Sequence, residues 1–148
     1  MKPTNQGETN VEYQPFEIKE KLKKIFEYHS DQPIETCPIR DVLSSASDKW
    51  SILIILFLGG YDVLRFGELK KRIHGISAKV LTERLRTLER DGYIIREVFP
   101  EVPVRVEYKL SNFGIRYLDK LILISEWIKD EMNLVIQSRL ELSLIHIS

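Results

Sequence analysis

The sequence predicts a mainly α-helical domain that carries one small β-hairpin. Three observations support this fold class. Apolar residues recur with helical spacing along most of the chain, Ser or Asp residues stand where several of these helices would begin, and two β-branched and aromatic runs flank a Pro-rich turn near residue 100. The length of 148 residues, with 43% hydrophobic and 30% charged side chains, suits one globular domain.

The first elements are an arm and two short helices. Residues 1–15 are polar, and we expect them to form a mobile N-terminal arm. A short amphipathic helix is predicted from Phe16 onward, until Pro33 and Pro38 open a loop. Residues 39–47 have the spacing of a second helix.

A nearly continuous apolar run follows at residues 50–58. Its period alone does not distinguish a strand from a buried helix. Asp48 is a suitable N-cap and Gly59-Gly60 a suitable C-terminal stop, so a helix is favoured. A helix that is apolar on every side must be surrounded, which predicts that it forms the centre of the core.

Residues 65–73 and 77–91 predict two helices that are joined by a turn at Gly75. Ser77 is placed to cap the second helix. Its inward positions are Leu81, Leu85 and Leu88. Residues 93–99 and 104–110 then predict the hairpin.

Ser111 is expected to cap a single long last helix with two apolar stripes. The first stripe comprises Leu118, Leu121, Ile122, Ile128, Met132 and Val135, and the second comprises Ile124, Trp127 and Leu134. Two helices joined by a short turn and followed by a hairpin are the order of a winged helix-turn-helix, with helices at both ends. We place this domain, with its flanking helices, at residues 16–139. Residues 140–148 form a tail that either extends the helix or is an appended sequence.

The charge of the chain is localised although its total is zero. Lys and Arg number 22, as do Asp and Glu. Residues 65–90 nevertheless hold eight Lys and Arg against three Glu, whereas every other segment is slightly acidic. A single positive segment of this kind predicts a pair of helices that faces an anionic partner. The alternative is a helix surface whose Lys and Arg side chains contact only solvent.

In a winged helix-turn-helix the second helix enters the DNA major groove and the hairpin lies along the backbone. An α-helix turns by 100° per residue, so four side chains point away from Leu81 or lie beside it. Their chemistry suits contacts with base edges, and they are Lys79, Thr82, Glu83 and Arg86. Ser77 would mark a phosphate site at the helix start, and Lys70, Lys71 and Arg72 would contact the backbone. Arg84 would bridge to a phosphate or to a carboxylate of the fold. On the wing, Arg105 is the first candidate and Arg96 the second.

Several motifs match a known family in order and spacing over about 90 residues. They are Cys37-Pro38-Ile39, Lys49-Trp50, Arg65-Phe66-Gly67-Glu68-Leu69, the run from Gly75 to Leu85, Leu88-Glu89-Arg90-Asp91-Gly92-Tyr93, Val106-Glu107-Tyr108-Lys109-Leu110-Ser111 and Gly114. From Cys37 to about Trp127 the chain resembles the HxlR-type winged helix-turn-helix regulators. The resemblance implies a cytoplasmic, homodimeric bacterial transcription factor that binds double-stranded operator DNA. Ser47-Asp48 replaces two glycines that the family usually has, which we expect only to tighten a turn.

Cys37 is the only cysteine, so a disulfide could form only between subunits or with a small thiol. The resemblance implies a redox-active thiol here, which would make a small electrophile or oxidant a partner. Arg40 could lower the pKa of that thiol. The alternative is an inert small apolar side chain.

Two apolar sets lack an evident partner within the chain and predict an isologous dimer interface. One set is Phe16, Ile25 and Phe26, and the other is Ile124, Trp127 and Leu134. Packing of these sets on each other within one chain is the alternative.

Other function classes have little support in the sequence. The three His residues are scattered, and neither a metal-ligand pattern nor a catalytic motif is present, so we expect no enzyme, metal or cofactor. No apolar run is long enough for a membrane span, and no secretory signal is present, so the expected location is the cytoplasm. A winged helix used only for protein–protein contacts remains the alternative to DNA binding.

Overall fold

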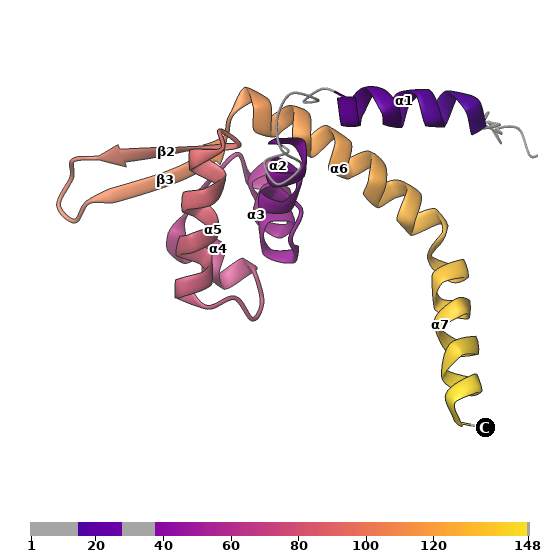
Figure 1. Cartoon of the computed structure of the whole chain (residues 1–148). Helices are drawn as coiled ribbons and strands as arrows, with labels where there is room; N and C mark the ends of the chain where they lie inside the picture. Colours follow the sequence, from indigo (N-terminus) through magenta and orange to yellow (C-terminus); the bar gives the residue numbers. More distant parts are fainter. Residues whose placement is uncertain (1–14, 28–37, 148) are drawn as a thin grey trace, which may run out of the picture. The chain divides into compact units, whose positions relative to one another are not determined.

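A computed structural model describes residues 15–27 and 38–147 (Figure 1). The chain divides into two units, residues 1–41 and 42–148, and each is described by itself. In the first unit, Pro15–Glu27 form the predicted amphipathic helix α1. The predicted mobile arm lies outside the described residues, except for Pro15.

Helices α2 (Pro38–Ala46) and α3 (Lys49–Tyr61) follow. The predicted N-cap of α3 is confirmed, because the Asp48 side chain accepts hydrogen bonds from the backbone N–H groups of Trp50 and Ser51. The predicted stop at Gly59-Gly60 is wrong. Helix α3 continues to Tyr61, and Asp62 ends it with a left-handed φ of 61°. Gly59 serves packing instead, since a Cβ there would overlap the Leu118 side chain of a later helix.

A three-stranded antiparallel sheet has the strand order β1-β3-β2. The predicted hairpin is confirmed as β2 (Ile94–Phe99) and β3 (Arg105–Leu110). Strand β1 (Val63–Arg65) was not predicted from the sequence. It has only three residues, and its partners on β3 lie more than forty positions later, at Glu107 to Lys109.

Helices α4 (Phe66–Arg72) and α5 (Ala78–Arg90) form the predicted helix-turn-helix. The turn between them contains Gly75, whose φ of 83° is accessible to glycine but costly for other residues. At its far end, α5 is tied to α2. The Ser45 hydroxyl donates to Asp91 over 2.7 Å, and the Arg90 Nε–H donates to the same carboxylate over 2.9 Å. The hydrogen bond from Arg90 is the main reason why the pKa of Asp91 is lowered.

The prediction of a single long last helix is wrong, because the structure has two helices there. Ser111 caps α6 (Asn112–Asp130) as predicted. The helix is interrupted at Glu131, and α7 (Met132–Ile147) begins after it. Figure 1 shows α7 turned away from the axis of α6. Leu134 therefore does not continue the stripe of Ile124 and Trp127 on one straight helix. Residues 140–147 are part of α7, and α7 buries none of its side chains.

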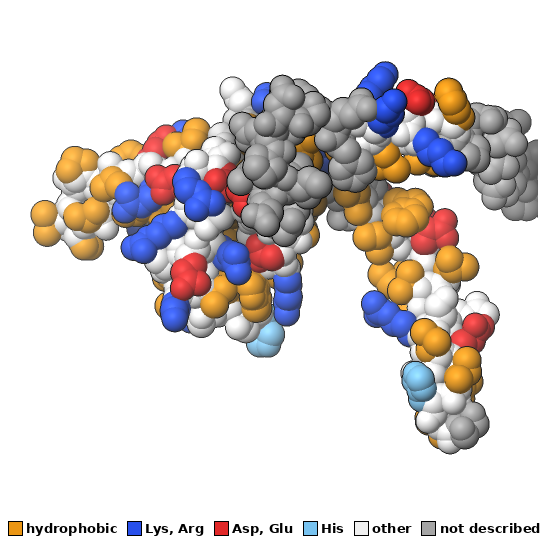
Figure 2. Space-filling view, in the orientation of Figure 1, with side chains coloured by type: hydrophobic (Ala, Val, Ile, Leu, Met, Phe, Trp, Pro, Cys, Tyr) orange, Lys and Arg blue, Asp and Glu red, His pale blue; other side chains and the backbone are white. Residues whose placement is uncertain are grey.

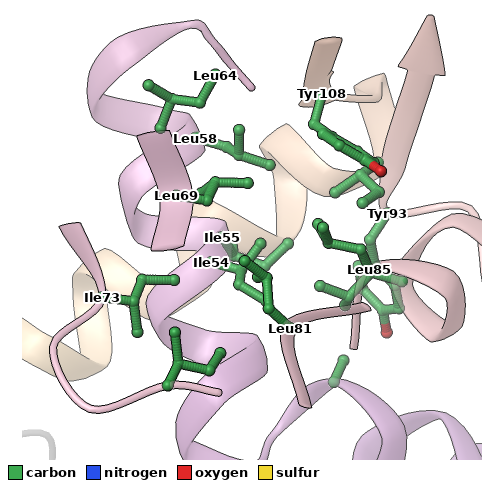
Figure 3. Packing of buried hydrophobic residues seen from close by; sticks show 14 of the residues in the cluster. Ile54, Ile55, Leu58, Leu64, Leu69, Ile73, Leu81, Leu85, Tyr93 and Tyr108 are labelled. Carbon is green, nitrogen blue, oxygen red and sulfur yellow. The ribbon is translucent and has the colours of Figure 1, made fainter. Parts of the chain in front are cut away.

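The core surrounds α3, as the apolar run predicted. Ile54 and Ile55 are fully buried there (Figure 3). Side chains from α4, α5 and all three strands pack around them: Leu64, Leu69, Ile73, Leu81, Leu85, Leu88, Ile94 and Tyr108. This packing fixes α5 with one face inward and leaves its other face exposed.

Candidate nucleic-acid interface

Helix α5 has two chemically different faces. Leu81, Leu85 and Leu88 are at most 2% exposed and hold the helix on the core. Lys79, Glu83 and Arg86 are exposed on the other side, and Thr82 lies half-buried between the faces. The structure therefore brings together the side chains expected to read base edges on one open face.

The start of α5 follows the cap geometry expected from its sequence. The Ser77 hydroxyl oxygen accepts a hydrogen bond from the Val80 N–H over 3.1 Å, and Ser77 is exposed. The Thr82 hydroxyl donates to the Ala78 carbonyl over 2.8 Å. The hydroxyl proton of Thr82 is thus used within the helix, which leaves the Thr82 methyl group and oxygen lone pairs for other contacts.

Arg84 faces the fold. Its Nε lies 3.5 Å from Oδ1 of Asp48, the carboxylate that caps α3. Of the two partners that the sequence left open for Arg84, the structure therefore places a carboxylate beside it. The expectation that Asp48 only tightens a turn is wrong, because the same side chain caps the core helix and pairs with α5. The pair is not evident from the sequence, because 36 positions separate its members.

The preceding helix α4 adds an exposed cationic end. Lys70, Lys71 and Arg72 occupy its last turn and are all exposed. The Arg72 guanidinium lies 4.1 Å from the centroid of the Tyr61 ring, so this side chain has a cation–π partner. The contact of Lys70 with the DNA backbone stays a prediction, and its side chain is exposed.

On the wing, Arg105 is held by its neighbours. It pairs with Glu101 over 2.9 Å and with Glu107 over 2.6 Å, and its guanidinium lies 3.9 Å from the centroid of the Phe99 ring. Burial acts to lower the pKa of Arg105, but the hydrogen bonds and charges of the two glutamates outweigh it and raise the pKa. Arg105 must exchange these partners before it can contact a phosphate.

The strand register separates Arg96 from Arg105. Arg96 is paired with Tyr108, whereas Arg105 is paired with Phe99. Because alternate residues of a strand point to opposite faces, Arg96 shares the face of Tyr108 and Arg105 lies on the other face. Arg96 is exposed on the side where the hairpin meets α5. Figure 2 shows Lys and Arg side chains gathered beside α5 at the base of the hairpin, and apolar side chains over the hairpin tip.

A hollow of about 350 Å³ lies between α5, the start of α4 and the hairpin. It is lined by Phe66, Thr82, Leu85, Arg86, Glu89, Arg96 and Tyr108. In the sequence, Arg86 belongs to the predicted base-reading face and Arg96 to the predicted wing. Only the packing of the hairpin against α5 brings them to one hollow.

The remaining predicted site residues belong to the predicted dimer interface and to the predicted thiol site at Cys37. Of the apolar interface candidates, Phe16 is 74% exposed in its own unit, and Trp127 is 64% and Leu134 65% exposed. Ile25 and Ile124 are also exposed. The Phe26 side chain and Cys37 lie outside the described residues.

No helix in the described part of the chain is both long and apolar enough to cross a membrane. Within the same residues, no cluster of His, Cys, Asp or Glu could hold a metal ion.

A helix-turn-helix with a basic open face, followed by a β-hairpin, defines a winged-helix protein of the DNA-binding class. Residues 46–135 match the HxlR-like helix-turn-helix family. The chain belongs to this family of transcriptional regulators, as its motifs predicted.

Individual relatives agree with this assignment. The HTH-type transcriptional regulator YtfH of Escherichia coli is 38% identical over 100 residues, which cover 68% of this chain and 77% of YtfH. The redox regulator HypR in its reduced form superposes with a TM-score of 0.61 at 30% identity, over 68% of this chain and 98% of HypR. The reduced form of the transcriptional regulator YodB from Bacillus subtilis superposes with a TM-score of 0.56 at 33% identity, over 64% of this chain and 90% of YodB.

Proposed function

We propose that this protein is a cytoplasmic homodimeric regulator that binds a near-palindromic DNA operator, with the α5 helix of each subunit in a major groove. The observation that carries the proposal is the division of α5 into a buried leucine face and an exposed face with Lys79 and Glu83. Lysine suits the acceptors of guanine, and glutamate suits the amino group of cytosine. Both ionic side chains therefore have partners among base edges.

Lys79→Ala and Glu83→Ala test base reading by α5. Each variant should lose about 1–3 kcal/mol of operator binding and relax the preference at one base pair. Their effects on scrambled DNA should differ, because Lys79→Ala removes an attraction to phosphates and Glu83→Ala removes a repulsion. Titration of labelled operator and scrambled duplexes measures both quantities.

Lys120→Ala is the matched control, because Lys120 is exposed on α6 and pairs with Asp119 away from α5. It should bind like the unmodified protein. If the double variant Lys79→Ala/Glu83→Ala kept full discrimination, a winged helix that makes only protein contacts would be favoured instead.

The proposed dimer rests on apolar side chains that the monomer leaves exposed. Ile124 and Trp127 are 52% and 64% exposed on α6, although large apolar groups favour burial. On the separate unit, Phe16 and Ile25 of α1 are exposed too. A two-fold interface would cover such surfaces and would place two α5 helices about 34–36 Å apart, one DNA turn.

The proposed regulation acts through the thiol of Cys37. It is supported by the similarity to HypR, which is a redox regulator, and to YodB, which has also been studied after diamide treatment. Diamide should weaken operator binding by the unmodified protein, and a reducing thiol should restore it. Cys37→Ser should not respond, and mass spectrometry should locate the modification on Cys37. Unchanged operator binding by fully oxidised protein would contradict a sensing role.

A further inference from the structure

The hollow between α5 and the hairpin combines two arginines with an apolar floor. Arg86 comes from α5 and Arg96 from β2, and both are exposed. Phe66, Leu85 and Tyr108 form the apolar part of the lining. No ion pair of Arg86 or Arg96 is found within residues 15–27 and 38–147. Two cations of this kind attract a shared anion.

The wing itself offers a poorer cation for this purpose. Arg105 lies on the opposite face of the hairpin and is engaged by Glu101 and Glu107. The tip beyond it offers no free cation, since Val102 and Val104 are 102% and 63% exposed and Glu101 is acidic. The attraction for an anion is thus concentrated at the base of the hairpin, where Arg96 faces α5.

One acidic side chain also lines the hollow. Glu89 lies one helical turn after Arg86 on α5. Two arginines and one glutamate leave a single net positive charge, which matches one phosphodiester group. The helix that lines the hollow is the one that presents Lys79 and Glu83, so an anion bound here lies beside the proposed major-groove face.

We propose that this hollow holds one phosphate of the DNA backbone, gripped from α5 by Arg86 and from β2 by Arg96, where the strand passes from the recognition helix to the wing. The inference rests on the proposed function. It assigns Arg86 to the backbone instead of a base edge, and it moves the wing contact from Arg105 to Arg96. Phosphate contacts of this kind set register and orientation without reading sequence.

The test measures operator and scrambled-DNA affinity as a function of salt for Arg86→Gln, Arg96→Gln and the double variant. The double variant should weaken binding to both DNAs by the same factor. Its slope of log affinity against log salt should become shallower by about 1.8 for the dimer, the value for one phosphate in each of the two half-sites. A change of about 3.6 would indicate two separate phosphates for each subunit and would overturn the shared site.

A neutral methylphosphonate, placed at each operator phosphate in turn, locates the contact. When the methylphosphonate stands at one particular position in each half-site, Arg86→Gln and Arg96→Gln should no longer weaken operator binding. Glu89→Gln should strengthen binding to both DNAs. Lys109→Gln is the matched control, because it removes one cation from the opposite face of the hairpin, where Lys109 pairs with Glu97. It should leave the arginine-dependent phosphate contact in place.

The outcomes separate this inference from the proposed function. If the unmodified protein does not discriminate operator from scrambled DNA, the proposed function fails, and the inference fails with it. If the unmodified protein discriminates but the double variant binds both DNAs with the same affinity as the unmodified protein, only the phosphate site fails. A loss by Arg86→Gln that is confined to the operator would return Arg86 to a base edge and would also overturn the site. Equal thermal unfolding of the exposed-residue variants excludes misfolding as the cause.

Discussion

Replacing Gly114 by alanine should remove a large part of the stability of the winged domain. Gly114 is buried in the first turn of α6, and a Cβ there would overlap the carbonyl oxygen of Tyr93. That oxygen is a backbone atom and accepts hydrogen bonds from the N–H and the hydroxyl of Ser111, each over 3.0 Å. It cannot rotate away as a side chain would. We expect a loss of about 3 kcal/mol or more, at the upper end of overpacking effects.

Urea unfolding of Gly114→Ala beside Gly60→Ala measures this effect. Gly60 lies in α3, and a Cβ there meets nothing within 4 Å. Alanine at position 60 should be neutral or should stabilise by up to about 1 kcal/mol, because alanine is the better helix former. Equal unfolding midpoints for the two variants would refute the close approach of α6 to Tyr93.

Breaking the proposed dimer should have the largest effect on DNA binding. In Ile124→Gln/Trp127→Gln, two exposed apolar side chains of α6 become polar without any change of charge. Each monomer should fold normally, because neither side chain is part of its buried core. Operator affinity should fall by about 10²–10⁴-fold, since the second half-site no longer binds as part of the same assembly.

Sedimentation and operator titration at matched concentrations check this prediction. Ile115→Gln is the control, because Ile115 is 53% exposed on the same helix but lies outside the predicted stripe. That variant should remain dimeric and bind normally. A monomeric unmodified protein that binds a full operator tightly would contradict the dimer.

Much of the fold followed from local patterns. The leucines of α5 and its cap Ser77 are separated by spacings that helix geometry fixes, so their roles could be predicted. The two glycines in α3 misled the prediction, because a local stop signal cannot be distinguished from a glycine needed for close packing. Gly59 gives room to Leu118, which lies 59 positions later. The break at Glu131 was missed as well, since the apolar pattern continues across it.

The helix-turn-helix with its hairpin, the family and the helix that carries the positive charge could all be predicted from the sequence, because each depends on short-range spacing and composition. Tertiary packing, in contrast, sets which cations line the same hollow. Pairing of β2 with β3 turned Arg96 toward α5 and Arg105 away from it, and packing on the core brought Arg84 to Asp48. Strand register and helix packing join residues that are far apart in the chain, and spacing along the sequence carries no record of those distances.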